Sequence, residues 1–198
     1  MTRPRALFAI ATCVAIAAGI ALSILLVLRV PAGVERDAKI GGPFDLISDT
    51  GERVTEAALA GKPTVMYFGY TYCPEVCPTT LLDLSQWIEK LGREADELNY
   101  IFVTVDPERD TPSVMHAYLS SFDKRIRGFT GTPEQIAKIA EEYGVSYRRV
   151  PSDDGGYLID HSAVLYLIGP NGKFVDTIGY QEETASAISK LQHLIKTR

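Results

Sequence analysis

The chain has 198 residues, 46% of them hydrophobic, and carries 20 basic and 25 acidic residues, a formal net charge of −5 at pH 7. This length and composition predict one globular domain with an additional segment. The balance is acidic and contains no basic patch, which argues against nucleic acid as a partner.

The additional segment is an uncharged apolar run of 23 residues from Ala6 to Leu28. As a helix it is long enough to cross roughly 30 Å of hydrocarbon. Arg3 and Arg5 precede it, so the positive bias predicts residues 1–5 in the cytoplasm and the rest outside. Cleavage as a signal peptide after Ala15-Ile16-Ala17 is the alternative, but the apolar run continues for eleven residues beyond that motif. We therefore expect an uncleaved transmembrane anchor.

The chain after the anchor divides into a tether and a domain. Residues 29–42 contain Gly, Pro and mixed charge without periodicity, which is typical of a tether. Residues 43–198 form the predicted domain. The domain is expected either in a bacterial periplasm or in the mitochondrial intermembrane space. The short N-terminus without a transit segment favours a single pass through a bacterial inner membrane, with the domain in the periplasm.

The domain opens with a predicted hairpin and a central strand. Residues 44–46 and 53–55 flank the turn residues Asp49-Thr50-Gly51, which predicts two short paired strands. The β-branched and aromatic run from Thr64 to Gly69 predicts a buried central strand.

A long amphipathic helix is predicted after Pro78. Apolar residues recur there at steps of three and four, at Leu81, Leu84, Ile88, Leu91, Ala95 and Leu98. One turn earlier on the same stripe lies Cys77, so Cys77 should face inward at the helix start, with Cys73 in the loop before it. Pro78 suits an early helical position.

The remaining elements complete the fold prediction. A second buried strand spans residues 100–105, and helices begin at Thr111-Pro112 and at the capping box Thr132-Pro133-Glu134-Gln135. Antiparallel strands are expected at residues 145–150, 163–168 and 173–180, followed by a helix over residues 183–196. A βαβ unit joined to a ββα unit predicts an α/β, thioredoxin-like fold with an N-terminal β-hairpin.

Two cysteines at the start of the predicted helix carry the clearest chemical signal. Cys73 and Cys77 are separated by three residues and are the only cysteines outside the apolar run. The free N–H groups and the dipole of a helix N-terminus stabilise a thiolate. Because a thiolate both binds metals and attacks disulfides, this location alone does not choose between the two tasks.

His161 offers a third donor atom. In a thioredoxin layout the loop before the strand at residues 163–168 lies against the helix that carries the cysteines, so we expect the imidazole to approach both sulfurs. Soft thiolates suit Cu(I), and imidazole binds both copper oxidation states, so the set favours copper. Zinc requires a fourth ligand, for which Asp160, Glu75 and Asp106 offer oxygen atoms.

A structural disulfide between Cys73 and Cys77 is the simplest alternative. By loop-entropy arithmetic so short a ring contributes only about 2 kcal/mol, whereas a metal bound by preformed ligands contributes on the order of 10 kcal/mol. In an oxidising compartment a close pair stays a dithiol only where a reductant or a metal maintains it. We therefore interpret the pair as a metal site.

Three motifs follow one another along the chain: Tyr67 to Pro78, Thr104 to Pro112 and Asp160-His161-Ser162. In this order they resemble the SCO/SenC family. Residues 128–132 and 166–172 are also similar to that family, so the resemblance covers residues 40–196 and the anchor.

The resemblance implies a membrane-anchored copper protein with a thioredoxin fold, whose relatives help to assemble the binuclear copper centre of cytochrome c oxidase. On that pattern Cys73, Cys77 and His161 bind Cu(I), Cu(II) or both, and Asp106 lies in a loop near them. Tyr72 stands where many relatives have histidine. This change concerns the docking surface rather than the ligand set.

Three functions follow as expectations. The first is a copper metallochaperone that delivers copper to the copper-binding subunit of cytochrome c oxidase, with another periplasmic copper chaperone or a thiol reductant as a further partner. The alternative is an enzyme, a thiol–disulfide oxidoreductase that uses Cys73 and Cys77 to keep the cysteines of that subunit reduced. A sensor of copper or redox state is a third possibility. His161 discriminates between the first two, because only copper binding requires it.

Overall fold

A computed structural model describes residue 19 and residues 40–152 and 155–197. The chain divides into two units, residues 1–38 and 39–198, and the fold below is that of the second. The predicted anchor, apart from Gly19, and nearly all of the tether lie outside the described residues. In the part of the chain that the structure describes, no helix combines the length and the apolarity needed to cross a bilayer.

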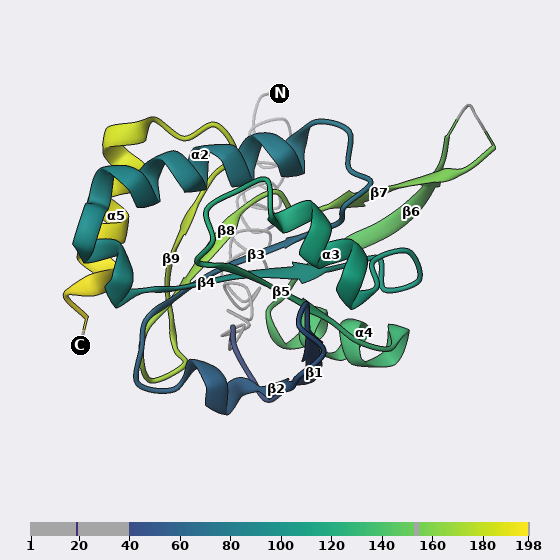
Figure 1. The fold of residues 1–198 in the computed structure, drawn as a ribbon, viewed down its shortest axis with the longest axis horizontal. Helices are drawn as coiled ribbons and strands as arrows, with labels where there is room; N and C mark the ends of the chain where they lie inside the picture. Colours follow the sequence, from purple (N-terminus) through teal and green to yellow (C-terminus); the bar gives the residue numbers. More distant parts are fainter. Residues whose placement is uncertain (1–18, 20–39, 153–154, 198) are drawn as a thin grey trace, which may run out of the picture. The chain divides into compact units, whose positions relative to one another are not determined.

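A seven-stranded mixed sheet forms the centre of the domain, in the order β2-β1-β5-β4-β3-β8-β9 (Figure 1). Its strands are β1 (Asp45–Ser48), β2 (Arg53–Thr55), β3 (Thr64–Gly69), β4 (Asn99–Thr104), β5 (Ile126–Thr130), β8 (Leu165–Ile168) and β9 (Phe174–Ile178). Strands β3, β4 and β5 run parallel, and the other neighbours are antiparallel. Every residue of β3 is buried, which confirms the predicted central strand, and the antiparallel pairing of β1 with β2 confirms the N-terminal hairpin.

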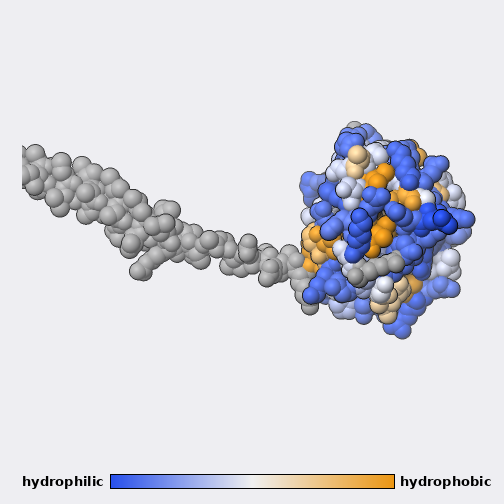
Figure 2. Space-filling model, turned by 90° about the vertical axis from the view of Figure 1, so that its left-hand side faces the viewer, coloured by the Kyte–Doolittle hydropathy of each residue, from blue (hydrophilic) through white to orange (hydrophobic). Residues whose placement is uncertain are grey.

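Helices cover this sheet. They are α2 (Val76–Leu91), α3 (Pro112–Leu119), α4 (Pro133–Glu142) and α5 (Thr184–Ile195), with short 3₁₀ helices η1 (Glu56–Leu59) and η2 (Gly92–Glu97). Helix α5 packs against α2 and β9, α3 against β5, and α4 against β1. The mixed central sheet with its helices agrees with the predicted thioredoxin-like α/β fold. The side of the domain that lies to the left in Figure 1 is largely hydrophilic, with apolar side chains in small groups (Figure 2).

Local signals fixed the starts of two helices. Thr111 caps α3 by accepting a hydrogen bond from the Val114 N–H, and the Thr132–Gln135 capping box of α4 is complete in both directions. Such side chains satisfy N–H groups that have no partner within the first helical turn. Both predicted starts are confirmed.

The prediction of one long helix extending to Leu98 is wrong. Helix α2 ends at Leu91 because Gly92 adopts a positive φ of 58°, and η2 continues the chain in a tighter conformation. Ala95 and Leu98 are still buried. The apolar stripe therefore reported burial correctly but not the continuity of the helix.

Two further differences concern strands. Strand β5 was not predicted; it lies between β1 and β4. The predicted strand at residues 145–150 corresponds to β6 (Tyr147–Pro151), but it pairs with a second unpredicted strand, β7 (Tyr157–His161), in a separate two-stranded sheet. This β6–β7 hairpin extends from the body of the domain at the right of Figure 1. His161 is therefore the last residue of a strand rather than a loop residue.

Candidate metal centre

The two cysteines lie where β3 gives way to α2. Cys77 is fully buried in the first turn of the helix, and Cys73, in the preceding loop, is 9% exposed. The Cys77 N–H donates a hydrogen bond to Cys73 Sγ over 3.3 Å. The last residue of β3 has to be glycine, since a Cβ on Gly69 would lie 2.8 Å from both Cys77 Sγ and the Phe102 ring. The position of the Cys77 sulfur therefore depends on the close approach of strand β3 and helix α2.

The β6–β7 hairpin brings His161 to this position. His161 Nε2 lies 3.4 Å from Cys77 Sγ, and Nδ1 lies 3.0 Å from the carbonyl oxygen of Ser162. A carbonyl oxygen can only accept, so Nδ1 carries the proton and Nε2 presents a lone pair toward the sulfur. The imidazole also meets the rings of Tyr67 and Tyr70 edge-on, with centroids 6.2 and 5.8 Å away.

Donor atoms of the three residues therefore converge. One atom each from Cys73, Cys77 and His161 lies within 4.8 Å of the others. Both cysteines are free thiols. Two sulfurs and one imidazole nitrogen form a soft set that fits copper better than calcium or magnesium, which prefer oxygen.

The oxygen ligands considered for zinc are not part of this group. Among the described residues the group contains no carboxylate. Asp160 belongs to the opposite face of β7 from His161 and pairs with Arg148 over 2.8 Å. Glu75 is exposed, and Asp106 is fully buried but accepts hydrogen bonds from Arg109 and Tyr157.

The two sulfurs differ electrostatically. The pKa of Cys73 is lowered, chiefly because the Cys77 thiol hydrogen-bonds to its sulfur, and His161 and backbone N–H groups act in the same direction against the effect of burial. The pKa of Cys77 is raised by that same contact, by burial and by the neighbouring negative charge. In the free dithiol Cys73 is therefore the thiolate and Cys77 keeps the proton.

Tyr67 completes the inner wall of the site. Its hydroxyl donates toward Cys77 Sγ over 3.6 Å, and its ring packs against Phe102. Burial is the main cause that raises the pKa of Tyr67, so the hydroxyl remains a donor. This contact was not predicted, although the alternation along β3 could have indicated that Tyr67 and Gly69 share the face toward α2.

The loop between β4 and α3 supports the site from one side. Asp110 is buried and accepts hydrogen bonds from the N–H and hydroxyl of Thr71 and from the hydroxyl of Thr104. Burial raises the pKa of Asp110 despite these donors. The loop that precedes Cys73 is thereby fastened to the end of β4.

Tyr72 and Tyr157 flank the guanidinium of Arg109. The Tyr72 side chain is 59% exposed, and its ring centroid lies 4.7 Å from Arg109 Cζ; the Tyr157 centroid lies 3.8 Å from the same atom. The sequence alone predicts no role for Tyr157. The Asp-Gly turn signal before it, followed by alternating inward residues, could have indicated the hairpin.

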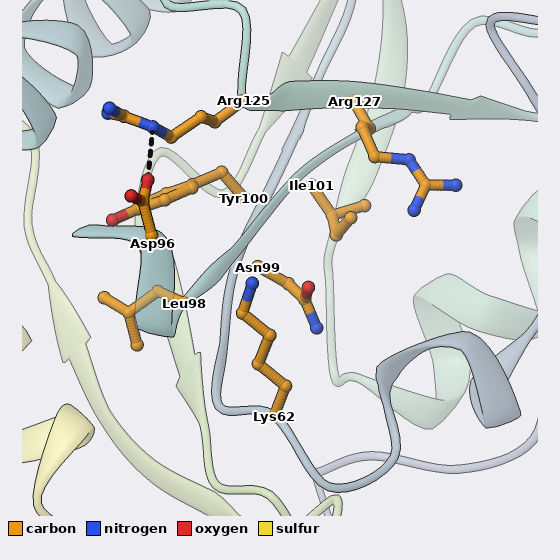
Figure 3. A pocket seen from close by; sticks show the side chains of 8 residues that line it. All are labelled: Lys62, Asp96, Leu98, Asn99, Tyr100, Ile101, Arg125 and Arg127. Atoms are coloured by element: carbon orange, nitrogen blue, oxygen red, sulfur yellow. Dashed lines mark ion pairs between the residues drawn. The ribbon is translucent and has the colours of Figure 1, made fainter. Parts of the chain in front are cut away.

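A pocket of about 290 Å³ lies elsewhere, at the N-terminal ends of β4 and β5 (Figure 3). Its lining includes Lys62, Asn99 and Arg127 but neither cysteine nor histidine. Asp96 is joined to Arg125 across it by an ion pair of 2.9 Å. The cysteines follow the opposite, C-terminal end of β3, so this pocket is separate from the sulfur site.

A model of the SCO1/SenC family matches residues 32–196 of the chain. Among curated proteins, Protein SCO1 homolog 1, mitochondrial, of Arabidopsis thaliana is 43% identical over 150 residues, and Protein SCO2, mitochondrial, of Saccharomyces cerevisiae is 38% identical over 161 residues. These matches cover 75% and 79% of this chain but 45% and 53% of the relatives. The chain thus spans about half the length of these two curated relatives.

The fold is also similar to that of solved structures. The structure of Bradyrhizobium japonicum ScoI with copper bound has a TM-score of 0.73 and 45% sequence identity to this chain. The similarity covers 78% of this chain and 99% of the solved one.

Proposed function

The chain belongs to the SCO1/SenC family, and we propose that it is a copper metallochaperone that helps to assemble the binuclear copper centre of cytochrome c oxidase. The observation that supports this most directly is the convergence of donor atoms of Cys73, Cys77 and His161 within 4.8 Å. A structure of the related ScoI of Bradyrhizobium japonicum contains copper. We infer that these three residues are the copper ligands.

Copper is the cargo in this proposal, so the site must both hold the ion and release it. Cys77 is fully buried whereas Cys73 is slightly exposed, and we expect an acceptor to approach from the Cys73 side. The proposed acceptor is the copper-binding subunit of cytochrome c oxidase. Another periplasmic copper chaperone is the proposed donor.

The proposed architecture follows from the sequence. Residues 6–28 anchor the chain in the inner membrane, residues 29–42 form a tether, and residues 43–198 form the copper-binding domain in the periplasm. A phosphatase reporter that is active only after export, fused at residue 30, should be active. An inactive fusion would contradict this orientation.

Thiol–disulfide exchange is the second candidate. It is favoured by the free state of the thiols and by the opposite directions in which their pKa values are shifted. A thiolate at Cys73 would attack the disulfide of a target, forming a mixed disulfide and releasing one target thiol. Cys77 would then attack the Cys73 sulfur, which releases the second target thiol and leaves a Cys73–Cys77 disulfide. A periplasmic thiol reductant would restore the dithiol.

His161→Ala in the full-length chain tests which function applies. Removing one of three ligands should weaken Cu(I) binding roughly 200- to 300-fold, if a binding free energy of about 10 kcal/mol is shared equally among the three ligands. Dithiol exchange should continue, because both cysteines remain. Competition with a Cu(I) chelator measures the affinity, and exchange with a model disulfide measures the thiol activity.

His193→Ala is the matched control, since His193 is exposed on α5 and should leave copper affinity unchanged. Oxidase assembly in cells then separates the functions. Copper delivery predicts that His161→Ala fails to support assembly. Full support by a variant that no longer binds copper would instead favour the reductase.

A further inference from the structure

The β6–β7 hairpin that carries His161 is joined to the rest of the domain by the chain at its two ends and by side-chain contacts. Its two strands pair with each other and with no strand of the main sheet. The position of His161 relative to the cysteines therefore depends on how the hairpin is fastened to the body rather than on the backbone hydrogen bonds of a shared sheet.

One fastening point is a stack in which aromatic rings and guanidinium groups alternate. Arg109 Cζ lies 4.7 Å from the ring centroid of Tyr72 and 3.8 Å from that of Tyr157, and Arg149 Cζ lies 4.5 Å from the Tyr157 centroid. We call these four residues, Tyr72, Arg109, Tyr157 and Arg149, the ladder. The ladder joins the cysteine loop, the β4–α3 loop and both strands of the hairpin.

Arg109 is bound at its centre on several sides. Its Nε donates to Asp106, and its Nη1 donates to the carbonyl oxygen of Tyr157 over 3.1 Å. Nη2 is buried and has no hydrogen-bond partner among the described residues. The faces of the flanking rings attract the positive charge of this partly buried side chain, so the guanidinium is held by stacking as well as by hydrogen bonds.

Tyr157 is held through three different groups. The ring faces Arg109, the backbone carbonyl accepts from Arg109, and the hydroxyl donates to the buried Asp106 over 2.9 Å. On the outer side Arg149 is joined to Glu108 by an ion pair of 2.7 Å. The start of β7 is therefore fixed to the β4–α3 loop from both sides.

Strand β7 links these contacts of Tyr157 to the metal site, because its side chains alternate between two faces. Tyr157, Ile159 and His161 share one face of the strand because side chains alternate with a period of two. The Ile159 N–H donates to Tyr70 Oη over 3.1 Å, and His161 follows two residues later. At the other end of the ladder, Tyr72 directly precedes Cys73. The ladder thus connects the residue that precedes Cys73 with the strand that ends at His161.

We propose that Arg109 is a positioning residue, and that through the ladder it holds the His161 hairpin against the cysteine loop so that the imidazole is available to copper. The part that concerns copper rests on the proposed function. Fixing the hairpin is a property of the metal-free protein and is tested separately.

Arg109→Lys in the full-length chain is the first test. Lysine keeps the charge but loses the planar group that stacks and donates at several positions. In the metal-free protein, amide exchange over residues 157–161 should become faster. Copper affinity should fall roughly 10- to 100-fold, as is usual when a residue that orients a metal ligand is changed. The histidine nitrogen signal in the electron paramagnetic resonance spectrum of the Cu(II) form should weaken.

Arg148→Ala is the matched control. Arg148 precedes Arg149 on β6 and pairs across the hairpin with Asp160, but it contacts no member of the ladder by stacking. It should leave the copper spectrum and affinity as in the wild type.

Tyr72 provides a second test with little effect on folding, because its side chain is largely exposed. Tyr72→Leu removes the ring and should accelerate exchange at Ile159 and weaken the histidine signal. Tyr72→Phe restores the ring and should rescue both. Such rescue distinguishes stacking from a general effect on stability.

The outcomes separate this proposal from the proposed function. Wild-type exchange rates and a wild-type nitrogen signal in both Arg109→Lys and Tyr72→Leu would overturn the positioning role. The wild type could instead bind no copper while Arg109→Lys still accelerated exchange over residues 157–161. The proposed copper metallochaperone function would then be wrong, but the proposal that Arg109 fastens the hairpin would stand.

Discussion

The two sulfurs of Cys73 and Cys77 share one helix start, yet they have different surroundings. Cys77 faces the core beside Tyr67, whereas Cys73 lies at the edge of the core and accepts the backbone N–H of Cys77. A thiolate is stabilised by such donors and destabilised by burial in apolar surroundings. The protein therefore places the negative charge on one sulfur before any metal arrives.

This difference predicts how the metal-free thiols react with pH. Because the pKa of Cys73 is lowered, its thiolate persists well below the ordinary thiol pKa of about 8.5. Alkylation of Cys73 by iodoacetamide should therefore stay near its maximal rate at neutral pH, while Cys77, whose pKa is raised, should remain unreactive. Peptide mapping after alkylation at a series of pH values measures both.

Cys77→Ala provides the control for that experiment. The thiol of Cys77 is the largest contribution that lowers the pKa of Cys73. Its removal should move the onset of Cys73 alkylation toward higher pH. Alkylation of wild-type Cys73 with the profile of an ordinary thiol would contradict the electrostatic description.

Elements with strong local signals were predicted correctly from the sequence. The uniform β-branched and aromatic run of β3 and the capping box of α4 each specify a structure within a few residues. Strand β5 was missed because Arg127 and Gly128 interrupt any apolar pattern. Gly128 is nevertheless buried. It packs so closely against α3 that an added Cβ would clash with Met115 and Leu119. Its strand is specified by that tertiary contact.

The candidate site was predictable to a similar degree. The convergence of Cys73, Cys77 and His161 was expected from the thioredoxin layout and from family resemblance. The stacking of Arg109 on Tyr157 was not expected, because the two residues are far apart in sequence and belong to a loop and to an unpredicted strand. No local periodicity reports a contact of that kind.

The junction of β3 and α2 gives a prediction at the scale of elements. Gly69→Ala places a methyl group 2.8 Å from Cys77 Sγ and from the Phe102 ring, and neither neighbour can move freely in a packed core. Overpacking of this kind costs about 1–3 kcal/mol of unfolding free energy. The displaced sulfur should also lower copper affinity. Chemical denaturation and chelator competition measure the two effects.

Gly179→Ala is the corresponding control. Its nearest neighbour would be the Glu182 carboxylate at 3.9 Å, an ordinary contact, and its φ is not positive. We expect a change in unfolding free energy within about 0.5 kcal/mol. Unchanged stability and copper affinity in Gly69→Ala would show that strand and helix can separate at no cost.

On the scale of the whole domain, the proposed copper ligands belong to two parts with separate sheets. The cysteines belong to the main body, and His161 belongs to the hairpin. An ion bound by all three ligands would join these parts directly, in addition to the ladder. Copper binding should therefore be visible as stability of the whole domain and as protection of the hairpin.

The final prediction concerns thermal unfolding with and without copper. A ligand that binds only the folded state adds about 2.7 kcal/mol when its free concentration is 100 times Kd, which for a domain of this size corresponds to a rise in Tm of about 5–10 °C. Reduced wild-type protein titrated with Cu(I) should show this rise, slower amide exchange over residues 157–161, and reversal of both by a chelator. His161→Ala, compared at the same copper concentration, should show a smaller rise and no protection of the hairpin. Equal shifts in Tm for wild type and variant would mean that copper binds without His161 and adds no link between the hairpin and the body of the domain.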